Sequence, residues 1–151
     1  MASEKFDLTG KTALITGGAG LLGMEHGAAL LECGATVVLT DLSGAALDAA
    51  VEQLGKDFDR SCIHVMTMDV TQPADIAATA QTLAGKGLRI DILVNNAAID
   101  PKVKGELGVM ETSRLENFPL DQWDLQIAVG LTGAFLCSQV FGAAMARDGK
   151  G

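Results

Sequence analysis

The stretch from Thr12 to Gly23 constrains the fold of this chain most, because it joins a strand pattern to a glycine pattern. The residues up to Thr16 are apolar or β-branched and predict a buried strand. Gly18, Gly20 and Gly23 then follow in the G-x-G-x-x-G spacing, which has meaning when it lies between a strand and a helix. In that context the backbone N–H groups of the loop approach a pyrophosphate closely. The pattern predicts a dinucleotide-binding turn, and the alternative is an ordinary glycine-rich loop.

An acidic residue follows the next apolar run at the distance that a ribose-binding carboxylate requires. Ala35 to Thr40 predicts a second strand, and Asp41 comes 18 residues after Gly23, close to the separation of about 20 that is typical of dinucleotide-binding folds. A carboxylate there accepts ribose hydroxyls and repels a 2′-phosphate. No Lys or Arg lies between Lys11 and Lys56 to offset that repulsion. The sequence therefore favours NAD over NADP, unless Asp41 serves only to cap the next helix.

Strand and helix patterns alternate along the chain. Two further strands are predicted at Cys62 to Met68 and at Ile90 to Val94. Helical patterns separate the strands at Leu21 to Cys33, Ser43 to Lys56 and Pro73 to Lys86. This alternation predicts an α/β fold of the Rossmann type, with a parallel sheet in the order 3-2-1-4 flanked by helices. The ligand crevice is expected at the carboxyl ends of the first and fourth strands.

Local signals predict which helix faces are buried and where helices begin. Helical spacing places Leu21, Met24, Ala28 and Leu31 together on the expected inner face of the first helix. We expect Ser43 to cap the second helix, and Thr71 to introduce the third.

Residues 121–148 predict a long final helix with more apolar surface than one core contact requires. Its uncharged part, Leu125 to Ala146, is long enough to span a membrane. Gln, Thr, Ser and Gly residues interrupt this part, so we expect a buried helix of a soluble protein rather than a membrane span. The aromatic residues Trp123, Phe135 and Phe141 are expected in the core rather than at a cofactor.

Composition excludes several classes of function. The 151 residues form at most one ordinary domain, and the formal net charge of −8 without a basic patch argues against nucleic-acid binding. Cys33, Cys62 and Cys137 lack metal-ligand spacing, so we interpret them as reduced core thiols of a cytoplasmic protein. The polar N-terminal segment also lacks the apolar stretch of a signal peptide. His26 and His64 are isolated, and we expect them to be structural or solvent-facing.

Two motifs together resemble those of the short-chain dehydrogenase/reductase family. Thr16-Gly17-x-x-Gly20-x-x-Gly23 is similar to the glycine motif of the family's longer, sugar-nucleotide branch. Asn95-Asn96-Ala97-Ala98 is similar to the Asn-Asn-Ala-Gly tetrad of its shorter, one-domain branch. The resemblance implies that residues 1–151 form the NAD-binding Rossmann domain of an oxidoreductase that transfers a hydride between nicotinamide and a carbonyl or alcohol. It also implies a homodimer or homotetramer that pairs through residues 121–148.

The resemblance assigns a role to each residue around the expected crevice. The pyrophosphate would contact Gly17, Gly18, Gly20, Leu21 and Leu22, with Gly23 packing the helix on the strand. Asp41 would bind the adenosine ribose, and Leu42 would lie beside the adenine. The Asp69 side chain would reach the adenine amino group, and Val70 would contact the ring. Asn95 and Ala97 would lie along the nicotinamide ribose. No metal site is implied.

The chain departs from the family at the residues that transfer protons. Relatives use a Ser, a Tyr and a Lys four residues after that Tyr, and this chain has no tyrosine. Gly130, within Val129-Gly130-Leu131-Thr132-Gly133, occupies the position of a helical Asn that helps to run a proton relay in relatives. Its absence puts the relay in doubt here, where a water could substitute for the Asn side chain. A glycine inside a helix also suggests a kink or close packing there. We therefore expect no catalytic residue in this chain and no turnover by it alone.

Three functional hypotheses remain open. The chain is the N-terminal part of an NAD-dependent oxidoreductase, apparently truncated before the fifth strand, or a non-catalytic NAD-binding or interaction module, or one piece of a split enzyme. The substrate is a small molecule that the sequence does not identify. The region from Ile99 to Asp121 lacks a sustained period, and four apolar residues in it either line the substrate pocket or cover the sheet: Leu107, Val109, Met110 and Phe118.

Overall fold

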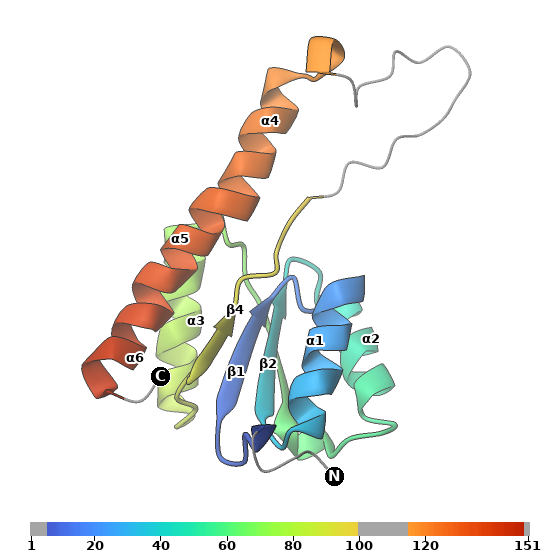
Figure 1. Ribbon diagram of the computed structural model, residues 1–151, viewed down its shortest axis with the longest axis vertical. Helices are drawn as coiled ribbons and strands as arrows, with labels where there is room; N and C mark the ends of the chain where they lie inside the picture. The colour runs from blue at the N-terminus through green and yellow to red at the C-terminus, as the bar shows by residue number, and fades with distance from the viewer. Residues whose placement is uncertain (1–5, 100–114, 150–151) are drawn as a thin grey trace.

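The structure is a computed structural model that describes residues 6–99 and 115–149. Its centre is a four-stranded parallel sheet in the order β3-β2-β1-β4, which confirms the predicted order (Figure 1). The strands are β1 (Thr12–Thr16), β2 (Thr36–Asp41), β3 (Ile63–Thr67) and β4 (Ile92–Val94). Each predicted strand boundary lies within two residues of the observed one. Leu107, Val109 and Met110 lie outside the described residues.

Helices cover both faces of the sheet. On one face lie α1 (Leu21–Glu32) and α2 (Gly44–Leu54), and on the other lie α3 (Pro73–Gly85) and the long final helix (Figure 1). The long helix runs from Leu120 to Asp148. It consists of α4 (Leu120–Ile127), α5 (Gly133–Cys137) and α6 (Ala143–Asp148), joined by the π-helical turns η4 (Ala128–Thr132) and η5 (Ser138–Gly142). Short 3₁₀ turns occur at η2 (Arg60–Cys62) and η3 (Leu115–Asn117).

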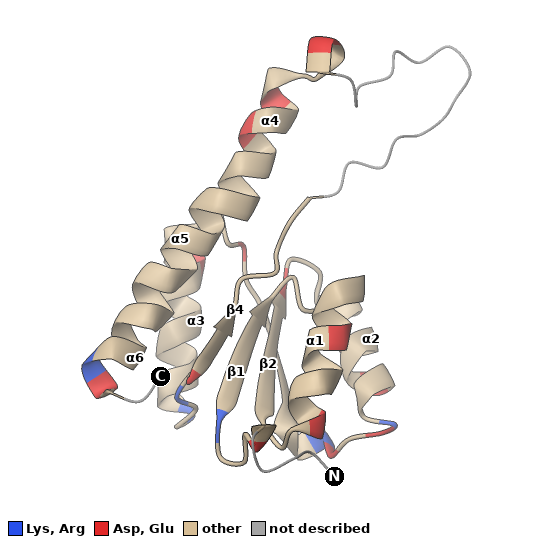
Figure 2. Cartoon of the chain, viewed as in Figure 1, with Lys and Arg blue, Asp and Glu red and all other residues tan. Residues whose placement is uncertain are grey.

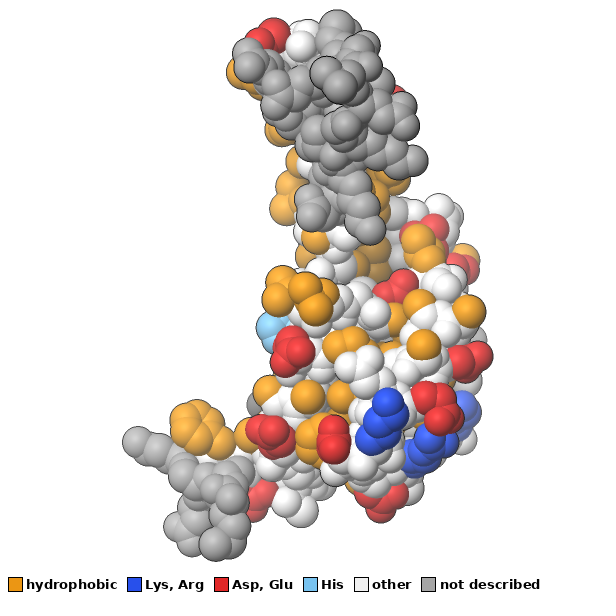
Figure 3. All heavy atoms as spheres, turned by 90° about the vertical axis from the view of Figure 1, so that its right-hand side faces the viewer, with side chains coloured by type: hydrophobic (Ala, Val, Ile, Leu, Met, Phe, Trp, Pro, Cys, Tyr) orange, Lys and Arg blue, Asp and Glu red, His pale blue; other side chains and the backbone are white. Residues whose placement is uncertain are grey.

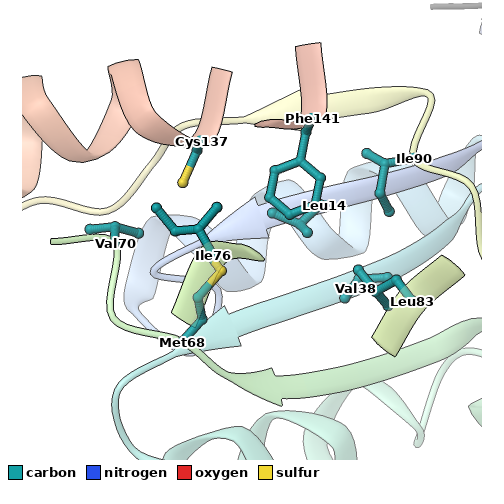
Figure 4. Packing of buried hydrophobic residues seen from close by; sticks show 9 residues of the cluster. All are labelled: Leu14, Val38, Met68, Val70, Ile76, Leu83, Ile90, Cys137 and Phe141. Carbon is teal, nitrogen blue, oxygen red and sulfur yellow. The ribbon is translucent and has the colours of Figure 1, made fainter. Parts of the chain in front are cut away.

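Alternate residues of each central strand point to opposite cores. Leu14 and Val38 belong to the core under α3 and the long helix, where Cys137 and Phe141 point toward the sheet (Figure 4). Ile15, Val37 and Leu39 belong to the core under α1 and α2. All five residues of β1 are buried, as expected for a parallel strand that is covered on both faces.

The buried face of α1 differs from the predicted one. Gly23, Gly27 and Leu31 are buried, whereas Leu21 is 83% exposed, and Met24 and Ala28 are only partly buried. The small residues let the helix approach the sheet, since a Cβ added at Gly27 would lie 3.4 Å from the Leu39 Cδ2 atom. Leu21 lies in the first turn of α1, at the crevice end of the helix.

The predicted starts of α2 and α3 are both right, but Thr71 does not cap α3. The Ser43 hydroxyl accepts a hydrogen bond from the Ala46 N–H group at 3.2 Å, which caps α2. The N-cap residue of α3 is Gln72. Thr71 instead donates its backbone N–H and its hydroxyl to the Asp69 carboxylate, and therefore belongs to the turn before the helix.

The long helix is more exposed than predicted. Phe141 is buried, but Trp123 and Phe135 are 55% and 61% exposed, so the expectation that they lie in the core is wrong for this chain. For Trp123 the physical reason is visible in Figure 1, where α4 extends past the carboxyl ends of the strands. Phe135 lies in α5 between the buried Gly133 and Cys137, and its side chain is on the outer face of the helix. The close packing suggested for Gly130 is also wrong, because a Cβ there would meet nothing within 4 Å among the described residues. Gly130 lies inside the π-helical turn η4.

The long helix also passes the length and composition test for a membrane span. Among the described residues, one helix is long and apolar enough to cross a membrane, the 29-residue helix from Leu120 to Asp148. In its most apolar 18-residue stretch, 17% of the residues are buried. By itself this is weak evidence, because core helices of soluble proteins pass the same test.

The isolated cysteines and histidines differ in how deeply they are buried. All three cysteines are free, and Cys137 is fully buried. Cys62 is half-buried and packs against the core under α1 and α2, whereas Cys33 is half-buried at the C-terminal end of α1. His26 is exposed, and His64 is half-buried on β3, where burial and then the charge of Lys86 lower its pKa. No group of three potential metal ligands occurs in residues 6–99 and 115–149.

A buried carboxylate ties β1 to the segment that leads into β4. Asp91 is 5% exposed, and its Oδ2 atom accepts a hydrogen bond from the Thr12 N–H group at 3.0 Å. Its Oδ1 atom pairs with Arg89 and lies 3.8 Å from the Lys11 Nζ atom. These charges lie at the amino-terminal edge of the sheet, away from the crevice.

Candidate cofactor site

The glycine loop lies so close to neighbouring backbone that it leaves no room for a Cβ atom at Gly17 or Gly23. Gly17 has φ +63°, and a Cβ there would lie 3.0 Å from the Ala97 Cα atom. A Cβ on Gly23 would lie 2.7 Å from the Gly18 Cα atom and closer still to the Gly17 carbonyl oxygen. The start of α1 therefore lies directly against the loop backbone. Because the loop carries no side chains at these glycines, a pyrophosphate can approach its backbone N–H groups.

The carboxyl end of β2 holds the loop at two points. The Gly18 N–H group donates to the Thr40 carbonyl at 2.9 Å, and the Ala19 N–H group donates to the Asp41 Oδ2 atom at 3.2 Å. The other oxygen of Asp41 accepts from the Leu42 N–H group at 2.8 Å. Since Ser43 caps α2, the alternative that Asp41 caps this helix is wrong. Its carboxylate lies beside the glycine loop instead.

The loop after β4 is clamped to the end of β1. The Thr16 Oγ1 atom accepts from the N–H groups of Asn96 and Ala97, both at 3.0 Å. The Asn96 Nδ2 atom donates to the carbonyl oxygens of Thr16 and Gly17 at 3.0 and 3.1 Å. The sequence predicted Asn95 and Ala97 as site residues but did not predict that Thr16 and Asn96 would hold the two loops together. The available signal was a polar residue at the end of each of two adjacent strands.

Asn95 and its loop neighbour Ala97 face different surroundings. The Asn95 side chain is exposed, and its Nδ2 atom donates to the Ser138 Oγ atom of the long helix at 3.1 Å. Ala97 is half-buried and packs against the core under the long helix. Of the two asparagines in the tetrad, Asn95 is thus the one with an exposed side chain.

The turn after β3 brings Asp69 to the crevice but turns Val70 inward. The Asp69 Oδ1 atom accepts the backbone N–H and the hydroxyl of Thr71 at 2.8 and 2.7 Å. Val70 is 8% exposed, and a Cβ added at Gly133 would lie 2.8 Å from its Cγ2 atom. The Val70 side chain therefore supports the long helix, and little of this residue remains to contact an adenine ring.

Large apolar side chains are exposed at the crevice. Leu21, Leu22 and Leu42 are 83%, 64% and 72% exposed. They lie in the first turn of α1 and just after β2. Figure 3 shows apolar side chains exposed among acidic ones on the side of the molecule that carries α1 and α2. An apolar rim beside Asp41 suits a flat heteroaromatic base.

The electrostatics of this edge favour an anion at α1 and disfavour one at Asp41. The first turn of α1 contains no acidic residue, and no side chain caps its N-terminus, so its N–H groups remain available for phosphate. Lys and Arg of the described residues lie toward the opposite edge of the sheet (Figure 2). Asp41 and Asp69 therefore have no cationic partner at the crevice within residues 6–99 and 115–149.

A separate hollow of about 510 Å³ lies between α3 and the end of the long helix. Its lining includes Leu83, Ile90, Phe141 and Ala144, at the amino-terminal edge of the sheet. The glycine loop, Asp41 and Asn95 lie at the other end of the strands. The candidate cofactor site is therefore the crevice and not this hollow.

Comparisons with known proteins identify the family of this chain. The profile of the family described as short chain dehydrogenase matches residues 11–151. D-threitol dehydrogenase of Mycolicibacterium smegmatis is 35% identical over 146 residues, which cover 97% of this chain and 52% of that protein. Galactitol 2-dehydrogenase of Rhizobium johnstonii is 34% identical over 148 residues, which cover 98% of this chain and 53% of that protein.

Solved structures show the same fold. The crystal structure of gox2181 superposes with a TM-score of 0.82 at 31% sequence identity, covering 100% of this chain and 55% of that one. The chain spans about half the length of these relatives.

Proposed function

Since the chain belongs to the short-chain dehydrogenase family, whose members use NAD or NADP, we propose that it is the cofactor-binding part of an NAD-dependent oxidoreductase. One observation carries the proposal: the glycine loop, the open N-terminus of α1 and the Asp41 carboxylate meet at one edge of the sheet. A nicotinamide cofactor held there would exchange a hydride with a carbonyl or alcohol. The residues of this chain would bind and orient that cofactor.

Charge at the ribose position supports NAD over NADP. The Asp41 carboxylate accepts from the Ala19 and Leu42 N–H groups, which holds it beside the loop with lone pairs left for ribose hydroxyls. A 2′-phosphate at this place would meet a negative charge. No Lys or Arg of the described segments lies near to compensate it (Figure 2).

Proton transfer would need residues that this chain lacks. The sequence contains no tyrosine, and Gly130 has no side chain to take part in a relay. We propose that the 151-residue chain alone has no dehydrogenase turnover and that catalysis belongs to a longer protein. Two relatives are a D-threitol dehydrogenase and a galactitol 2-dehydrogenase, which favours a polyol or sugar as the substrate of that longer protein.

We propose that the chain self-associates through the outer face of the long helix. The charge and composition of the sequence favour a soluble, cytoplasmic protein that binds neither nucleic acid nor membranes. Leu131 and Phe135 lie one helical turn apart and are 65% and 61% exposed. We expect Leu131→Glu with Phe135→Glu to turn a dimer or tetramer into a monomer in analytical ultracentrifugation. Gln53→Glu, at an exposed position of α2 and away from the long helix, is the control. Flotation of the parent chain with lipid vesicles would instead favour the membrane alternative.

Calorimetric titration with NAD⁺, NADH and NADP⁺ tests the cofactor assignment. The parent is expected to prefer NAD⁺, and Asp41→Ala is expected to weaken NAD⁺ binding by about 10- to 100-fold, the effect of losing a hydrogen bond to a charged group. Asp48→Ala, on the exposed side of α2, should bind like the parent. Equal affinity of the parent for NAD⁺ and NADP⁺ would contradict the preference, and no binding of either would contradict the cofactor site itself.

A further inference from the structure

Ser138 connects the long helix to the loop that follows β4. It is the first residue of η5, and it lies 43 residues from Asn95 in the sequence. Its Oγ atom accepts a hydrogen bond from the Asn95 Nδ2 atom at 3.1 Å and donates one to the Ala134 carbonyl at 2.7 Å. Of the site residues predicted from the sequence, Asn95 is thus held by a side chain from a distant element.

The hydrogen-bond chemistry of a hydroxyl determines how the Asn95 amide is turned. A serine hydroxyl has one proton, and Ser138 uses it on the Ala134 carbonyl one turn earlier. Toward Asn95 it can therefore only accept. The amide must present its Nδ2 group to the helix, and because the amide is planar its Oδ1 atom is turned away from Ser138.

We propose that Ser138 is a positioning residue, which turns the Asn95 amide so that its Oδ1 atom accepts a hydroxyl of the nicotinamide ribose. This inference rests on the proposed function, because it requires a dinucleotide in the crevice. It extends that function by assigning a role to a helical residue that no sequence motif singled out.

The position of Ser138 does not depend on the bond that it makes. Its neighbour Cys137 is 0% exposed, and Phe141, one turn later, is 3% exposed, so both anchor this part of the helix in the core (Figure 4). Gly133 packs directly against Val70. The helix therefore presents the hydroxyl from a rigid support, which is what a positioning residue requires.

The loop that carries Asn95 is likewise held without Ser138. Asn96 and Thr16 clamp the loop to the end of β1 through four hydrogen bonds. The side chains of Asn95 and Ser138 are both exposed. Removing the Ser138 hydroxyl should therefore release the Asn95 amide and leave the fold intact.

A comparison of two ligands separates positioning from a structural role. NAD⁺ contains the nicotinamide ribose, whereas ADP contains only the adenosine half, and both would be titrated by calorimetry into the full 151-residue chain. We expect Ser138→Ala to weaken NAD⁺ binding by about three- to tenfold, the effect of one neutral hydrogen bond, and to leave ADP binding unchanged. Ser138→Thr keeps the hydroxyl and should bind NAD⁺ like the parent. Gln139→Ala, at the exposed neighbouring position, is the matched control.

The outcomes distinguish the inference from the function on which it rests. If Ser138→Ala binds NAD⁺ like the parent, or weakens NAD⁺ and ADP equally, the positioning role is wrong and the cofactor site stands. If the parent binds neither ligand, the proposed function fails, and the positioning role fails with it. The Asn95 side-chain amide signals in NMR provide a second readout without cofactor, and they should move in Ser138→Ala but not in Gln139→Ala.

Discussion

Replacing Gly23 by alanine should lower both stability and cofactor affinity, although alanine favours helices. Gly23 lies in the first turn of α1 and is buried. An added Cβ would lie 2.7 Å from the Gly18 Cα atom and 2.9 Å from the Gly18 carbonyl carbon. Both are backbone atoms of the glycine loop, so no flexible side chain can move aside, and the loop or the helix must shift.

The magnitude follows from two opposing effects. Overpacking of this kind costs about 1–3 kcal/mol, whereas exchange of Gly for Ala in a helix gains at most about 1 kcal/mol. Because the added Cβ would meet backbone atoms, we expect the upper part of that cost, about 2–3 kcal/mol. The expected net loss is then about 1–2 kcal/mol in the free energy of unfolding, which lowers the melting temperature by about 2–8 °C for a chain of this size. NAD⁺ affinity should fall as well, because the displaced loop is the one that would hold the pyrophosphate.

Gly130→Ala is the matched control, since the same substitution there meets none of the described residues. Within residues 6–99 and 115–149, a Cβ at Gly130 has no neighbour within 4 Å, so we expect only the helix preference to act. We expect this variant to gain up to about 1 kcal/mol of stability and to bind NAD⁺ like the parent. Both variants would be compared by urea unfolding and calorimetric titration. The packing argument is refuted if Gly23→Ala is as stable as the parent and binds NAD⁺ equally well.

Three further predictions concern single side chains. Ser43→Ala removes the cap that accepts from the Ala46 N–H group and should cost about 1 kcal/mol in urea unfolding; an unchanged midpoint would exclude the cap. Asp91→Ala leaves the buried Thr12 N–H group without its acceptor and should cost about 1–3 kcal/mol in the same assay, so a loss below a few tenths would contradict its role. Burial raises the pKa of the Cys137 thiol to about 11, so the folded state favours the neutral thiol. The free energy of unfolding should therefore fall as pH rises from about 9 to about 11. Urea unfolding at several pH values would show whether Cys137→Ala removes that fall.

The strands, their order and the glycine loop could be predicted because they depend on local patterns. Each strand is a short apolar run ended by a glycine or polar residue, and the alternation with helices permits few parallel arrangements. Asp41 could be placed beside the glycine loop for the same reason, since the carboxyl ends of neighbouring parallel strands meet at one edge. The close approach at Gly23 was implied by the motif spacing alone.

The errors and omissions concern distances between elements that are remote in sequence. Apolar spacing placed Leu21 inside and Phe135 in the core. Both are exposed, because Leu21 lies at the crevice end of α1 and Phe135 lies on the outer face of the long helix. Periodicity describes one helix and contains no information about where its partner ends.

The residues themselves determined the sheet, the cofactor loop and the acidic residue beside it. The tertiary structure alone decided which asparagine clamps the two strand ends and which one meets Ser138. It also turned Val70 under the long helix and brought the Ala19 N–H group to Asp41. The physical reason is that a hydrogen bond requires atoms within about 3 Å of each other, and only the packed arrangement of sheet and helices sets distances on that scale.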